Sequence, residues 1–157
     1  MSLLSSSNQR CHRLLDRQYQ DFLESLTALE LEQAFACWQR FRNSLSKHIE
    51  FEETHVEPLT EAWEASTLTL IRADHSILKR LLPRLHQAFE TIAGAPAPRS
   101  ELVRQLDEFI KLRNVLQHHD LRENEHLYPL LEKQLTAERL RELAQAMDAA
   151  TDSSRET

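Results

Sequence analysis

The sequence is poor in glycine, in aromatic residues and in strand-forming patterns. One of the 157 residues is glycine, and aromatic residues make up 6%. No Asn-Gly or Asp-Gly turn occurs, and no stretch alternates Val, Ile or Thr with polar residues. Leu, Glu, Arg, Gln and Ala dominate instead, and these residues have high or moderate helix propensity. We therefore expect one all-α domain, which is long enough to bury a substantial core.

Excess positive charge and long apolar runs are also missing. The formal net charge is −6, which argues against nucleic acid or an anionic membrane as a partner. No run of about 18 apolar residues could span a bilayer. The opening MSLLSSSNQR lacks the apolar core of a secretory signal. We therefore expect a cytoplasmic protein in which Cys11 and Cys37 are reduced, partly buried thiols.

Apolar residues recur every three or four positions in four stretches, which predicts amphipathic helices over 8–28, 31–63, 67–92 and 100–134. Residues 5–8 are expected to cap the first helix. The Gly94–Pro98 segment is the clearest break in the chain. These features predict an up-down four-helix bundle over 8–134.

The two ends of the chain are expected to lie outside this bundle. Residues 1–7 form an N-terminal extension in this interpretation. Residues 135–157 contain a short helix, capped by Thr136 and ending near Met147, and then a polar, disordered tail. Three prolines lie inside the predicted helices, and each should kink or end its helix; they are Pro58, Pro83 and Pro129.

One motif occurs twice, 71 residues apart. His48, Glu52, His55 and Pro58 spell His-x3-Glu-x2-His-x2-Pro, and His119, Glu123, His126 and Pro129 repeat it. Residues four apart lie on one face of a helix, about 6 Å apart along its axis. Each repeat therefore presents an imidazole and a carboxylate to the same point. This pair of groups is ligand chemistry for iron, zinc or manganese.

Two single histidines, His12 and His75, lie at the same level as these pairs. In an up-down bundle with short loops, residues equidistant from a turn share one height. The midpoints of His12 and His48, of His48 and His75, and of His75 and His119 fall at or near the predicted turns. Burying so many polar groups without a metal would leave several unsatisfied. The predicted ligands are His12, His48, Glu52, His75, His119 and Glu123.

A different metal site can be read from the same motif. His55 and His126 follow the two glutamates by three residues, as in the Glu-x2-His motif of ferritin-like di-iron sites, which need a further Glu on each of the other two helices. The positions level with them hold Leu70, Ile71, Ser7 and Asn8, so no carboxylate is available. The ferritin-like site remains an alternative, and we expect His55 and His126 to lie beside the ligands or at the end of the core.

Several other polar residues are expected to have structural or surface roles. Tyr19 should pack in the core. Glu53 should be solvated or lie behind the ligands. His86, His118 and Lys79 fall off the apolar stripes and should lie at the surface.

The segments CHRLLDR, HIEFEETHVEPL, RADHSILKRLL and HDLRENEHLYPLLEK together resemble the hemerythrin-like (HHE cation-binding) domain over residues 8–134. The resemblance implies a four-helix bundle that holds a non-haem di-iron centre. It implies that His12 and His48 bind one iron, that His75 and His119 bind the other, and that Glu52 and Glu123 bridge them.

The chain departs from the oxygen-carrying hemerythrins at two positions. These have His-x3-His in the third helix, where this chain has Lys79 in the second place, and Asp where this chain has Glu123. The pattern is closer to the branch implicated in nitric-oxide stress and iron-centre repair. One ligand fewer leaves an open position, and it leaves a single metal or zinc as alternatives to two irons.

We therefore expect a metal-binding protein that binds or responds to O2, NO or peroxide, or that handles iron, rather than an enzyme, and we assign no catalytic residue. One alternative is a di-iron oxidase or peroxidase-like enzyme. Another is a structural helical module with zinc or no metal. The composition is compatible with a homodimer but does not require one.

Overall fold

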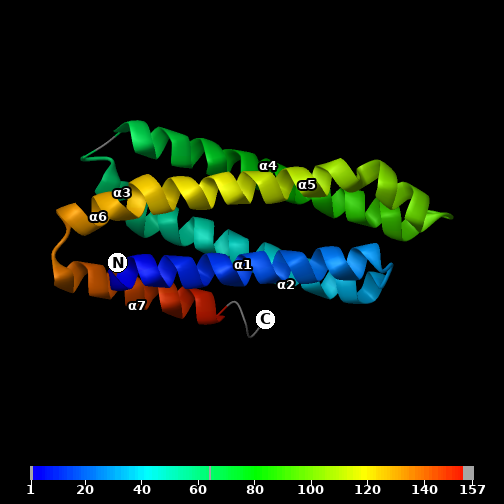
Figure 1. The fold of residues 1–157 in the computed structure, drawn as a ribbon, viewed down its shortest axis with the longest axis horizontal. Coiled ribbons are helices and arrows are strands. Elements are labelled where there is room, and N and C mark those ends of the chain that lie inside the picture. Colours follow the sequence, from blue (N-terminus) through cyan, green and yellow to red (C-terminus); the bar gives the residue numbers. More distant parts are fainter. Residues whose placement is uncertain (1, 64, 154–157) are drawn as a thin grey trace.

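The computed structural model describes residues 2–63 and 65–153, in which every regular element is a helix. The long helices run antiparallel to their chain neighbours (Figure 1). In order the elements are α1 Leu3–Thr27, α2 Leu31–Phe51, η1 Glu52–Val56, α3 Glu57–Thr60, α4 Ala65–Gly94, α5 Pro98–Arg122, η2 Glu123–Leu127, α6 Tyr128–Gln134 and α7 Ala137–Ser153. The predicted all-α, hemerythrin-like bundle is confirmed.

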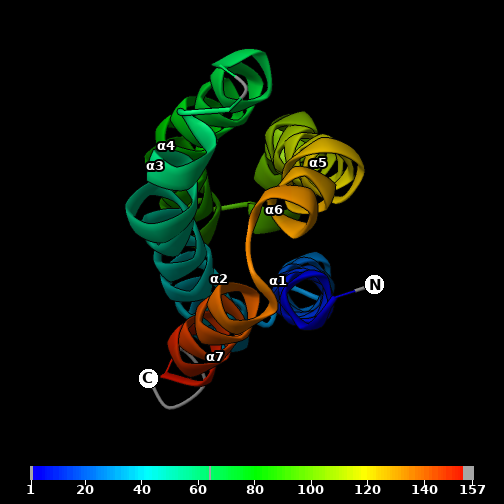
Figure 2. The same ribbon diagram turned by 90° about the vertical axis from the view of Figure 1, so that its left-hand side faces the viewer.

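The bundle consists of two helical hairpins, α1 with α2 and α4 with α5 (Figures 1 and 2). The turn between α1 and α2 is a Schellman motif, in which the amide of Glu30 bonds Ser25 O and the amide of Leu29 bonds Leu26 O. Leu29 there has a φ of 60°. This conformation favours glycine, but the Leu29 side chain packs against the core. The tight turn keeps α1 and α2 in register.

Two apolar clusters fill the interior on either side of the polar residues predicted to bind metal. The larger cluster contains the buried aromatic side chains of Phe22, Trp38 and Phe109. The smaller one, near the chain ends, contains Leu4 and Tyr128 among others. Along the four long helices, the predicted ligand histidines lie near the boundary between the two clusters. The site is therefore held at a fixed depth by packing above and below it.

Two of the three helix-embedded prolines coincide with a local change from α- to π-helix. The amide of Glu57 bonds Glu52 O, five residues back, and the amide of Tyr128 does the same with Glu123 O. A proline has no N–H and clashes with the carbonyl four residues before it, so the wider turn accommodates Pro58 and Pro129 without breaking the helix. The helix that begins as α2 continues through η1 into α3, and the one that begins as α5 continues through η2 into α6. α4 continues past Pro83. None of these prolines ends its helix.

Both predicted chain ends need correction. α1 begins at Leu3 with Ser2 as its N-cap, whose side chain accepts a hydrogen bond from the Ser5 amide at 3.2 Å, so the predicted cap at 5–8 is wrong. Most of the predicted extension 1–7 is therefore helix.

The fifth helix, α7, reaches Ser153 rather than Met147 and packs on α1 and α2 (Figure 2). Arg10 pairs with Asp148 at 2.8 Å, and Lys47 donates to Ser153 O at 3.0 Å. The expected disorder is wrong for 148–153, and 154–157 lie outside the described residues. No helix in the described ranges is long and apolar enough to cross a membrane.

Removing the Met147 side chain should destabilise the fold, because this residue of α7 is 1% exposed and packs in the smaller apolar cluster. Met147→Ala is expected to lower the free energy of unfolding by about 2–5 kcal/mol. Urea unfolding measures the change. Gln145→Ala, on the exposed face of the same helix, is the matched control. Equal effects of the two substitutions would contradict the packing of α7 on the bundle.

Candidate metal centre

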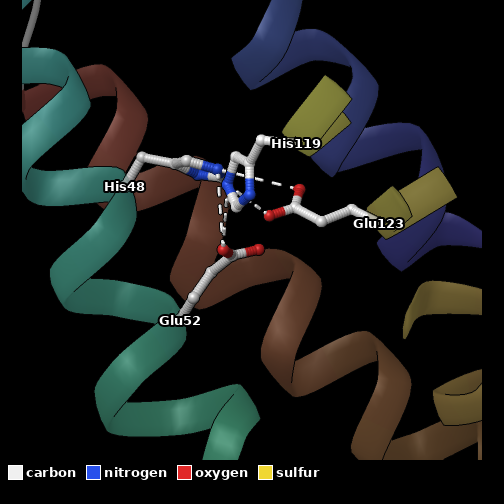
Figure 3. Close-up of side chains that lie close together, drawn as sticks. All are labelled: His48, Glu52, His119 and Glu123. Carbon is white, nitrogen blue, oxygen red and sulfur yellow. Dashed lines mark ion pairs between the residues drawn. The ribbon is translucent and has the colours of Figure 1, made fainter. Parts of the chain in front are cut away.

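Six polar side chains from both hairpins converge in the interior. Figure 3 shows four of them, with His48 and Glu52 from one hairpin facing His119 and Glu123 from the other. Glu52 and Glu123 are fully buried, and even His12, the most accessible of the six, is 7% exposed. Sequence reasoning placed His12, His48, Glu52, His75, His119 and Glu123 at one level, and the structure brings all six together. That they bind metal stays a prediction.

The four histidines form two pairs. The ring centroids of His12 and His48 lie 4.8 Å apart, and those of His75 and His119 lie 4.9 Å apart. Nε2 of His12 is 3.0 Å from Nε2 of His48. Each pair contains one of the single histidines, His12 or His75, and one histidine of a His-x3-Glu motif, His48 or His119.

Each carboxylate lies against histidines of both pairs. An oxygen of Glu123 is 3.0 Å from Nε2 of His12, and its other oxygen is 2.7 Å from Nε2 of His119. Oε2 of Glu52 is 3.2 Å from Nε2 of His75 and 3.8 Å from Nε2 of His48. This is the arrangement that carboxylates bridging two cations would need.

Two further buried side chains hold these carboxylates in place. The Tyr128 hydroxyl donates to Oε1 of Glu52 at 2.6 Å. The Asn8 side-chain amide donates to Oε2 of Glu123 at 3.3 Å. Both donors lie on helices that contribute to the smaller apolar cluster, Asn8 on α1 and Tyr128 on α6. Sequence reasoning did not find either of them.

The outer ring nitrogens face away from the centre and meet partners of their own. Nδ1 of His12 contacts Asp120, and Nδ1 of His75 is 3.3 Å from Glu57. Nδ1 of His119 is 3.7 Å from Asp74. A carboxylate behind a metal-binding histidine fixes the ring and raises its basicity, so these three residues would tune a bound cation.

His48 differs from the other three histidines, because its Nδ1 lies 3.5 Å from the thiol of Cys11. Cys11 and Cys37 are free, as predicted, but both are buried rather than partly buried. Arginine side chains near the surface pair in turn with two of the outer carboxylates. Arg72 pairs with Glu57 at 2.7 Å, and Arg122 contacts Asp74.

The contact between His119 and Glu123 at the centre provides a test of whether a cation fits. Nε2 of His119 and Oε1 of Glu123 are fully buried and lie 2.7 Å apart as an ion pair, and neither makes a well-directed hydrogen bond. Buried imidazole and carboxylate groups in such contact are costly unless a proton or a cation lies between them. Imidazole nitrogens and carboxylate oxygens are the donor set of iron, zinc and manganese. The residues present therefore fit a bound cation.

The pKa values of the buried groups also indicate that a cation fits the centre. Burial works against a charged His12, but Glu123 and Asp120 outweigh it and raise the pKa of His12 to about 10. Burial likewise opposes charging of His119, but Glu123 and Asp74 raise its pKa to about 10. Burial, helped by the charge of Glu123, raises the pKa of Glu52 to about 6. Protons on His12 and His119 offset the charge of the buried carboxylates, and a bound cation would take their place.

The model of the hemerythrin HHE cation binding domain matches residues 66–156, more than half of the chain. The chain belongs to this hemerythrin family. The matched segment contains His75, His119 and Glu123, whereas His12, His48 and Glu52 precede it. No curated protein and no solved structure matches the chain. His12, His48 and Glu52 are thus assigned from the sequence motif and the geometry, and not from the family match.

His55 and His126 do not lie beside the predicted ligands, and the expectation that they would is wrong. Both are exposed, because each lies within a π-helical turn. In an α-helix a residue three after Glu52 would share its face, but the wider turn rotates it outward. The ferritin-like Glu-x2-His arrangement is therefore not formed in the described part of the chain.

The remaining polar residues follow the predictions, with one exception. Lys79 is exposed and pairs with Glu53 at 2.7 Å, and His118 is exposed. The Tyr19 hydroxyl donates to Phe109 O at 2.6 Å in the core. His86 was expected at the surface but is partly buried and accepts a hydrogen bond from the Trp38 indole at 3.1 Å.

Asp74→Asn should weaken cation binding by about 10- to 100-fold, because the substitution removes the charge behind His119. Competition with a chromophoric chelator for Zn²⁺ measures the affinity. Asp107→Asn, an exposed acid on α5, is the matched control. Because Asp74 also contacts Arg122, metal-free unfolding is measured alongside. An affinity equal to that of the control would show that Asp74 does not act on the site.

Proposed function

We propose that this chain is a non-haem di-iron protein in which His12 and His48 bind one iron and His75 and His119 bind the other. Glu52 and Glu123 bridge the two ions. The observation that carries the proposal is that each buried carboxylate lies within 4 Å of histidines from both pairs. Ligand atoms of His48, Glu52, His119 and Glu123 lie within 4.8 Å of one another, a group that would also suit a single ion. His12 and His75 add a second imidazole beside His48 and His119, and these two histidine pairs favour two ions.

The proposed role is to bind or respond to O2, NO or peroxide, or to store and deliver iron. Two histidines and two bridging carboxylates leave each ion short of a full ligand set, and open positions bind small molecules. Lys79 stands where oxygen carriers have a further histidine, and here it is exposed and paired with Glu53. This departure supports placement near the nitric-oxide-stress and iron-repair branch.

The residues of this chain would orient the ions and keep water away from them. Bound iron supplies the open coordination positions and the redox chemistry. Tyr128 holds Glu52 in its bridging orientation, and Asn8 does the same for Glu123. The outer carboxylates orient the rings of His12, His75 and His119 so that Nε2 of these three points inward. The apolar clusters on either side exclude solvent.

Loss of a proposed ligand should remove most of the iron. His48→Ala and His119→Ala are each expected to lose the larger part of the iron bound by the wild-type protein, because the shared carboxylates cannot replace an imidazole. Metal analysis after reconstitution with ferrous iron, without chelator, measures the content.

His118→Ala is the matched control, because His118 adjoins His119 in sequence but is exposed. Its iron content should equal that of the wild-type protein. Equal iron content in all three variants would overturn the ligand assignment. Zinc bound in preference to iron would point to a structural site instead.

A further inference from the structure

Two hollows lie in line along the seam between α1 and α5. The outer one is a surface groove of about 300 Å³, bordered by Asp16, Tyr19 and Leu116 among others. The inner one is a narrow space of about 10 Å³ that reaches His12, His48 and His119. Asp16 and Leu116 border both hollows. The two hollows therefore adjoin at these two side chains, and the inner one reaches the proposed metal centre.

The seam is one of the two that separate the hairpins, and the other, between α2 and α4, is packed as loosely. α1 packs along α2, and α4 packs along α5, whereas α1 and α5 make few close backbone contacts (Figure 2). Leu15, Leu45 and Leu116 form the apolar part of the inner hollow's lining, and the proposed ligand histidines and two aspartates form the rest. His12, beside this seam, is the most accessible side chain of the six.

We infer that this seam is the entry route for small uncharged molecules of two or three atoms, which reach the metal centre past Leu116. The inference rests on the proposed di-iron function. A space of about 10 Å³ accommodates about one water-sized molecule, so O2 or NO fits and a larger organic molecule does not. Asp16 and Asp120 border the inner hollow, and their charge opposes the entry of anions.

A third hollow, similar in size to the inner one, reaches His48 from another side and provides a comparison. It lies under α7 and is bordered by Cys11, Ser44, Met147 and Ala150. Cys11 contacts Nδ1 of His48, the nitrogen that faces away from the centre. The hollow under α7 therefore ends behind a histidine, whereas the α1–α5 seam ends among three of them.

The test narrows the seam with Leu116→Phe and widens it with Leu116→Ala. Iron content is measured first and should match that of the wild-type protein. Stopped-flow mixing of the reduced, iron-loaded protein with nitric oxide then gives the association rate, dissociation rate and equilibrium affinity. A route alters both rates by the same factor and leaves affinity unchanged, whereas a disturbed metal site alters the affinity.

Leu116→Phe should slow association and dissociation by about tenfold, and Leu116→Ala should accelerate both. Leu15→Phe narrows the seam from the α1 side and should act like Leu116→Phe, which keeps the test decisive if one variant folds poorly. Ala150→Leu fills the hollow under α7 and should leave both rates unchanged.

Three results would overturn the inference. Normal iron content with rates unaffected by the Leu116 and Leu15 variants would reject the route but leave the proposed function standing. Slowing by Ala150→Leu alone would place the route under α7. Wild-type protein that takes up no iron would instead overturn the proposed function and the route with it.

Discussion

The structure depends on the burial of two carboxylates and four imidazoles at one level between two apolar clusters. Removing such groups from water costs several kcal/mol each unless they find partners. Each hairpin supplies two histidines and one glutamate, so neither hairpin can satisfy its polar groups alone. The contacts between Glu123 and His12, and between Glu52 and His75, cross from one hairpin to the other. A cation at this centre would link the hairpins where their backbones pack least closely.

The repeated motif specifies more than a pair of ligands. The proline six residues after each glutamate is accommodated by a π-helical turn that begins at the glutamate itself. This turn directs His55 and His126 outward and places Glu57 behind His75 and Tyr128 against Glu52. π-Helical turns occur frequently at functional sites. Here the turn decides which of two metal-binding motifs in the same residues is formed.

Much of the fold and of the cluster could be predicted from the sequence, because both follow from periodicity. The 3.6-residue repeat predicts the helices, and equal distances from the turns bring the six side chains to one level. The outer partners could not be predicted in this way. Asp74 adjoins His75 and Asp120 adjoins His119 in sequence, but each serves a histidine on a different helix. Such pairings depend on the rotation of the helices about their axes, which an apolar stripe defines only roughly.

The docking of α7 was underestimated for a related reason. Its apolar face is short and its sequence ends in polar residues, so composition alone suggests disorder beyond Met147. Ion pairs and hydrogen bonds from α1 and α2, through Arg10 and Lys47, extend the helix to Ser153. Contacts between distant segments thus decide where the helix ends.

The central claim is that the two proposed cations share bridging carboxylates and form one centre. Mössbauer spectroscopy in a variable magnetic field, on the oxidised iron-loaded protein, tests this claim most directly. Bridged ferric ions couple antiferromagnetically, so we predict a diamagnetic ground state for all of the bound iron. Magnetically independent high-spin ferric ions would contradict the account, even at full iron content.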